Sequence, residues 1–184
     1  GQVIHAVKSG LDPLGSSTGS AVAVAAGIVP MAVGTDTSHS ITACAMGNGI
    51  CGLKPPAGVL SQEGIIPISK TFDSAGAMAQ NVSDTLKLYS AMRDEPLPEI
   101  TQTPAGKLRI SVNIANADMN PQERRKYLDG VIETLRNNGV VISEVNQPPT
   151  PELPSIMKRE FGTGLEAYLI KSGAKLKTLK QMVE

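Results

Sequence analysis

The chain has 184 residues, of which 41% are hydrophobic, so it can bury one sizeable core and a single domain is the simplest expectation. Seventeen basic residues balance seventeen acidic ones, and charge therefore gives no reason to expect nucleic acid or an anionic membrane as a partner. The longest apolar run, residues 21–34, is too short for a bilayer and is interrupted by Pro30. Two cysteines fit a reducing compartment, and without a visible export signal we expect a cytoplasmic location.

The first half of the chain is rich in glycine, serine and alanine. The polar turn GSSTGS precedes an alanine-rich helix expected from about Thr18 to Gly27, and a strand is expected from about Val29 to Val33. Small side chains along this helix allow close packing against a sheet. The N–H groups and hydroxyls at its positive end can bind an anion, stabilise an oxyanion or simply cap the helix.

The second half follows a plainer pattern. Three prolines mark residues 92–106 as a linker. The alternation in 107–114 predicts a strand, Asn120-Pro121 begins a helix that Gly139 ends, and 140–145 predicts a second strand. Two strands joined by a helix usually pair in parallel, which predicts an α/β fold. Residues 151–184 have helical spacing.

Several short motifs have simpler explanations than catalysis. Residues 15–19 fit the G-x-S-x-G elbow of α/β-hydrolases, but no strand precedes them. Residues 172–175 fit S-x-x-K without its companion motifs, so they read as a solvated helix face. Cys44 and Cys51 are more simply small core residues than nucleophiles, and His5 reads as a surface or core-edge side chain.

Taken together and in order, GSSTGSAVAVAAG, GTDTSHSITA, GICGLKPPAG and EGIIPISKTFDSAGAMAQNVSDTLKLY resemble the signature region of the amidase signature family. The match covers about residues 13–92, and a weaker resemblance continues through the strand, helix and strand that follow. It implies an α/β fold in which helices flank a mixed sheet. We divide the chain into a signature core region (1–92), a linker (93–106) and a remainder of the same α/β domain (107–184).

The resemblance implies a serine amidohydrolase that uses a Ser–Ser–Lys triad. Ser40 corresponds to the nucleophile, Ser16 to the bridging serine with a cis peptide bond, and Ser17 to a supporting residue. A serine hydroxyl needs a base within hydrogen-bond reach. A second hydroxyl both donates and accepts, so Ser16 can relay the proton of Ser40 to a neutral lysine and later return one to the leaving amine.

The same resemblance places an oxyanion hole in the turn before the nucleophile. Its donors would be the backbone N–H groups of Thr37, Ser38, His39 and Ser40, and one such donor elsewhere contributes roughly 3 kcal/mol of transition-state stabilisation. Asp36 is the expected brace, because an aspartate side chain can accept hydrogen bonds from N–H groups ahead of it. Simple capping of the turn would use the same contacts.

The sequence departs from the family pattern in three respects. The catalytic lysine of the family lies several tens of residues before the bridging serine, whereas Lys8 is too close to Ser16; we therefore expect an incomplete, truncated domain without its base. Ser38 and His39 replace two glycines, which would cost about 1 kcal/mol if either position required positive φ. Thr42 and Cys44 stand where arginine and proline are usual.

These departures leave two main hypotheses. One is an amidase-type hydrolase that cleaves a C–N amide bond through an acyl-Ser40 intermediate, with residues 1–184 alone inactive; the other is a non-catalytic structural or binding member of the same fold. An esterase based on His39 is disfavoured, because successive side chains diverge. We expect a small-molecule amide substrate, no nucleic acid or membrane partner, no metal or organic cofactor, and self-association through exposed apolar faces.

Overall fold

The computed structural model describes residues 1–96, 103–113, 121–146 and 151–184. The chain divides into two compact units, one formed by Gly1–Pro98 with Glu152–Glu184 and the other by Glu99–Pro151. Three positions singled out in the sequence lie outside the described residues: the central part of the expected linker, the cap at Asn120, and the proline-rich residues 147–150.

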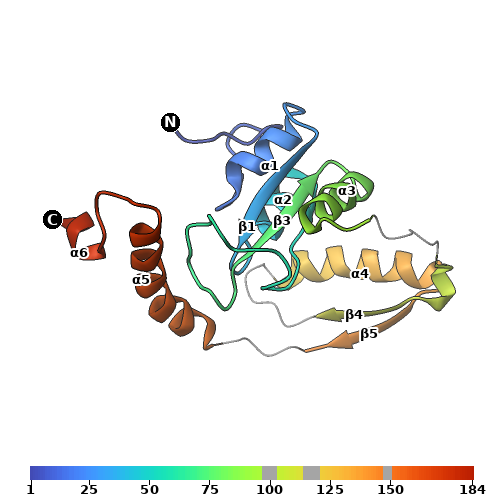
Figure 1. The fold of residues 1–184 in the computed structure, drawn as a ribbon. Coiled ribbons are helices and arrows are strands. Elements are labelled where there is room, and N and C mark those ends of the chain that lie inside the picture. Colours follow the sequence, from blue (N-terminus) through green and yellow to red (C-terminus); the bar gives the residue numbers. More distant parts are fainter. Residues whose placement is uncertain (97–102, 114–120, 147–150) are drawn as a thin grey trace. The chain divides into compact units, whose positions relative to one another are not determined.

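The first unit is built on a three-stranded antiparallel sheet in the order β1-β3-β2 (Figure 1). The strands are β1 (Met31–Asp36), β2 (Cys51–Leu53) and β3 (Ser74–Ala79). Three helices contact them: α1 (Thr18–Ala25), α2 (Thr42–Asn48) and α3 (Val82–Arg93). The unit is completed by α5 (Leu153–Lys171) and α6 (Leu179–Val183), and α5 runs beside the loop that leads into β3.

The core of this unit is made of small side chains. Its buried cluster comprises Ala21, Ile41, Cys44, Ala45 and Met78, with Leu14 and Ile50 packed against it. Because alanine and cysteine fill so little space, α1 and α2 approach the sheet closely. All six residues of β3 are buried, so this central strand lacks the alternation typical of a half-exposed strand.

Ile41 is fully buried over three glycines, one from each strand of the sheet. A Cβ added at Gly34, Gly52 or Gly76 would lie 3.0, 3.1 or 2.7 Å from an atom of the Ile41 side chain. Gly34 also lies directly opposite Gly76 in the β1–β3 register. Burying an isoleucine side chain contributes roughly 1.5–3 kcal/mol, so this hollow anchors the chain at residue 41.

The second unit is a strand, helix and strand. A short 3-10 helix (Ala105–Lys107) precedes β4 (Arg109–Asn113). The helix α4 (Pro121–Asn137) follows β4 in the chain and leads to β5 (Val141–Val145), which pairs in parallel with β4. Gly139 follows α4 with φ of +84°, a backbone conformation that glycine adopts without strain. The predicted parallel pairing is therefore confirmed.

The α/β class predicted from the sequence is confirmed, with antiparallel and parallel pairing present in separate sheets. The strand expected from about Val29 to Val33 is β1, which begins two residues later than predicted and continues to Asp36. Pro30 precedes the ladder, in keeping with the absence of an N–H group. No helix among the described residues is long and apolar enough to cross a membrane.

Candidate active site

The turn that joins β1 to α2 carries Ser40. β1 ends at Asp36 and α2 begins at Thr42, so residues 37–41 change the direction of the chain within five residues. Ser40 is partly exposed, whereas Ile41 immediately after it is fully buried. The Ser40 hydroxyl is thus held at the surface by a neighbour that is fixed in the core.

Asp36 braces this turn from inside. Its carboxylate is buried, and Oδ2 accepts hydrogen bonds from the N–H groups of Ile41 at 2.7 Å and Thr42 at 3.3 Å. Oδ1 has no aligned donor among the described residues, but the Lys54 Nζ lies 3.3 Å away and compensates its charge. The same Nζ donates to the carbonyl of Thr37 at 3.4 Å. Both ends of the turn are therefore tied to one ion pair.

The first two serines of GSSTGS lie beside this turn. The Gly15–Ser16 peptide bond is cis, and Ser16 is exposed. The N–H of Ser17 donates to the carbonyl of Ser40 at 3.3 Å. The Ser17 hydroxyl donates to the carbonyl of Thr35 at 2.9 Å and accepts from its N–H at 3.1 Å. The backbone preceding α1 is thus held against the end of β1. Ser17, the residue after Ser16, makes the backbone contact with Ser40.

The backbone of the turn leaves hydrogen-bond donors free. Within the described part of the chain, the N–H groups of Ser38, His39 and Ser40 have no acceptor. Neither Ser38 nor His39 has positive φ; among the described residues other than glycine, only Leu14 and Asp94 do. The side chains that replace two glycines of the family pattern therefore cause no strain of that kind here.

His39 and Cys44 differ sharply in exposure. The His39 side chain is exposed, and its carbonyl accepts the N–H of Ala43 at 2.7 Å. Cys44 is fully buried, and burial is the main cause that raises the pKa of its thiol. A protonated, inaccessible thiol is a poor nucleophile. His5 is also buried, with its ring hydrogen-bonded to the carbonyl of Gly47 at 2.8 Å, as a core-edge histidine would be.

The structure adds residues that the sequence analysis did not single out. Lys54 pairs with Asp36 as described above. Asp73, just before β3, accepts a hydrogen bond from the buried Thr37 hydroxyl at 2.6 Å. Glu160 of α5 accepts from the Ser69 and Thr71 hydroxyls. Each of these contacts joins segments far apart in the chain, and no local sequence pattern signals them.

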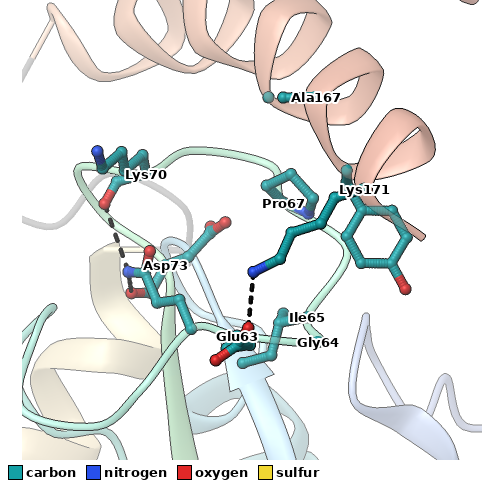
Figure 2. Close-up of a pocket in the computed structure, with 11 residues that line it drawn as sticks. Glu63, Gly64, Ile65, Pro67, Lys70, Asp73, Ala167 and Lys171 are labelled. Carbon is teal, nitrogen blue, oxygen red and sulfur yellow. Dashed lines mark hydrogen bonds and ion pairs between the residues drawn. The ribbon is translucent and has the colours of Figure 1, made fainter. Parts of the chain in front are cut away.

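Asp73 also lines a pocket of about 360 Å³ between the loop before β3 and α5 (Figure 2). Ile65, Pro67 and Ala167 are apolar lining residues, and Lys171 and Glu63, which also line the pocket, form an ion pair of 2.6 Å. No group of three His, Cys, Asp or Glu side chains in the described ranges is arranged to hold a metal ion.

Comparison with known proteins identifies the family of the chain. A sequence profile of the Amidase family matches residues 1–183, and the chain belongs to this family. It is 33% identical to the A subunit of the glutamyl-tRNA(Gln) amidotransferase of Lactobacillus acidophilus over 94% of the chain and 40% of that protein. A probable amidase of Arabidopsis thaliana is 32% identical over 86% of the chain and 35% of that protein.

Solved structures give the same result. The peptide amidase of Stenotrophomonas maltophilia superposes with a TM-score of 0.79 at 30% identity, covering 100% of the chain and 42% of that enzyme. An amidase family protein from Bacillus anthracis gives a TM-score of 0.81 at 28% identity, covering 100% of the chain and 40% of the other. The chain therefore spans about 40% of the length of these relatives.

Proposed function

We propose that the protein is an amidohydrolase that cleaves a C–N amide bond through an acyl-enzyme ester on Ser40. The observation that carries this proposal is the turn before α2, in which consecutive N–H groups have no acceptor among the described residues and Ser40 is partly exposed. Consecutive N–H groups that have no acceptor within the protein and are aimed at a developing oxyanion are what acyl transfer requires.

The proposed chemistry assigns one role to each serine. Ser40 Oγ attacks the amide carbon while its proton passes to Ser16 Oγ, which gives its own proton to a neutral base. The tetrahedral oxyanion is held by the N–H groups of the turn. The C–N bond then breaks as the amine takes a proton through Ser16, and water hydrolyses the ester by the same steps in reverse order. Ser17 supports this arrangement through its hydrogen bonds to Ser40 and Thr35.

We propose that the base is a lysine outside residues 1–184. Lys54 contacts the turn, but its Nζ is engaged by Asp36 and by the Thr37 carbonyl. Lys8 is exposed in the segment before the Ser16 turn. The relatives, which are more than twice as long as this chain, have room for such a residue.

The substrates of relatives suggest which amides to test first. One relative is named as a peptide amidase and another as an amidotransferase subunit. We propose small carboxamides and peptide amides as the substrate class, and a cytoplasmic location for the reaction. Ammonia release from a panel of aliphatic amides, peptide C-terminal amides and glutamine would identify the preferred group.

A fluorophosphonate probe tests the nucleophile directly. The complete gene product that carries this chain should be labelled, and Ser40→Ala should abolish labelling and amide hydrolysis. Ser172→Ala is a matched control, because that exposed hydroxyl bonds the Leu169 carbonyl far from the turn in sequence; its labelling should equal that of the wild type. A folded wild-type protein that is neither labelled nor active would instead indicate a non-catalytic member of the family.

A further inference from the structure

A buried hydrogen bond joins the nucleophile turn to a distant loop. The Thr37 hydroxyl donates to Asp73 Oδ1 at 2.6 Å, and both residues are buried, with 6% and 5% of their surface exposed. Thr37 lies three residues before Ser40, while Asp73 lies 36 residues after Thr37, immediately before β3. A charge-assisted bond of this length in a buried setting is among the stronger hydrogen bonds in proteins.

The carboxylate of Asp73 is held firmly from its other side. Oδ2 accepts the N–H groups of Ile68 at 2.8 Å and Ser69 at 2.9 Å. The N–H of Asp73 in turn donates to the carbonyl of Ser69 at 2.8 Å. These three bonds close residues 68–73 into a compact turn, so Asp73 presents Oδ1 to Thr37 from a fixed position.

A helix from the end of the chain reinforces this turn. Glu160 of α5 accepts hydrogen bonds from the Ser69 hydroxyl at 2.5 Å and from the N–H and hydroxyl of Thr71 at 3.0 and 2.5 Å. Figure 2 shows the loop passing between α5 and Asp73, with Lys70 on the loop. A continuous series of hydrogen bonds therefore leads from α5 through the loop to the turn that carries Ser40.

We infer that Thr37 and Asp73 form a positioning pair that sets the direction of the oxyanion N–H groups and of Ser40; this inference rests on the proposed function. The far end of the turn is already fixed by Ile41 in its glycine hollow and by Asp36. The N–H groups between these ends have no acceptor of their own. Their aim therefore depends on the Thr37 end, where the Lys54 Nζ holds the carbonyl and Asp73 holds the side chain by the shorter bond.

Loss of the Thr37 hydroxyl should lower kcat strongly and change KM little. Thr37→Val keeps the shape of the side chain and the backbone N–H but removes the donor. Misplacing a catalytic group by about 1 Å can cost about 100-fold, so we expect kcat and the rate of fluorophosphonate labelling both to fall 10- to 100-fold with KM within about threefold. Thr37→Ser, which restores the hydroxyl, should recover most of the rate.

Thr85→Val is the matched control for this experiment. Thr85 is buried to the same degree, with 4% exposed, and its hydroxyl donates to the Asn81 carbonyl at 2.8 Å in α3. Each valine variant loses the hydrogen bond of one buried threonine, and Thr37→Val should lose more thermal stability because its partner is a buried carboxylate. Only Thr37→Val should lose labelling rate when both are assayed well below their melting temperatures, in the complete gene product.

The outcomes separate this inference from the function on which it rests. If the wild-type protein is labelled and Thr37→Val is labelled equally fast, the positioning role is wrong while the function stands. If Thr37→Ser is as slow as Thr37→Val, the hydroxyl is not the cause and the inference fails. An unlabelled, inactive wild-type protein overturns the proposed function and this inference with it.

Discussion

Neutralising Asp36 should destabilise the protein by about 3 kcal/mol. Its buried carboxylate accepts two N–H groups, at 2.7 and 3.3 Å, and faces the Lys54 Nζ at 3.3 Å. Breaking a buried ion pair by removing one partner costs about 3–5 kcal/mol. The Lys54 side chain is 26% exposed and can recover part of its hydration, which places Asp36→Asn at the lower end of that range.

A double-mutant cycle separates the ion pair from the hydrogen bonds. Lys54→Met removes the cation and leaves a carboxylate whose side chain is 0% exposed without charge compensation, so it should cost at least as much as Asp36→Asn. The double variant should cost less than the two single changes together, by about 1.5 kcal/mol. Urea unfolding of the complete gene product followed by circular dichroism measures all three, since this chain contains no tryptophan.

An exposed ion pair in the same chain supplies the control cycle. Lys87 and Asp84 in α3 lie 2.7 Å apart with 52% and 31% of their side chains exposed, and surface pairs of this kind contribute about 0.3–0.5 kcal/mol. Asp84→Asn with Lys87→Met should therefore show little coupling. A coupling between Asp36 and Lys54 as small as in this control would refute the reasoning, because it would mean that the buried pair does not act as a unit.

Two further predictions test the glycine hollow and the α5 contact. Gly76→Ala should cost about 3 kcal/mol or more by overpacking, because its Cβ would lie 2.1 Å from the Leu53 carbonyl oxygen. Gly130→Ala, in open space on a helix, should stabilise by about 0.5–1 kcal/mol, and urea midpoints compare the two. Hydrogen bonds from two loop hydroxyls and one N–H, with a smaller effect of a nearby arginine, lower the pKa of Glu160 from 4.5 to about 2. The stabilisation that the Glu160 carboxylate gives the folded protein should therefore be complete above pH 4.5 and disappear as the pH falls toward 2. The melting temperatures of the wild type and Glu160→Gln should converge over that range. A constant difference between them would contradict this account.

The parts of the fold with a clear periodicity were predictable from the sequence. The alternation of 107–114, the apolar spacing of the following helix and Gly139 predicted β4, α4 and their ending. β3 was not predictable, because SAGAMA is buried on both faces and is made of residues with weak strand preference. Glycine at position 76 leaves room for the β2 backbone and, together with Gly34 and Gly52, for Ile41.

The candidate site was predictable in part. The resemblance to the amidase signature pairs Ser16 with Ser40, and in the structure the N–H of Ser17 donates to the carbonyl of Ser40. Lys54 and Asp73 lie within the same motifs but carried no visible role. Their partners are set by the register of three strands and by the path of a loop, which a local pattern does not encode.

The departures from the family pattern at Ser38 and His39 bear on catalysis less than the sequence alone indicates. The replaced glycines would matter if the turn required positive φ, and neither position has it. The His39 side chain is exposed, so it is not packed into the core. What remains different is Cys44, which is buried in the core, and Thr42, whose hydroxyl bonds the carbonyl of His39 at 3.5 Å. A side chain that short cannot extend from α2 as the usual arginine would, so the difference from the family concerns contacts beyond the turn rather than the backbone that would hold the oxyanion.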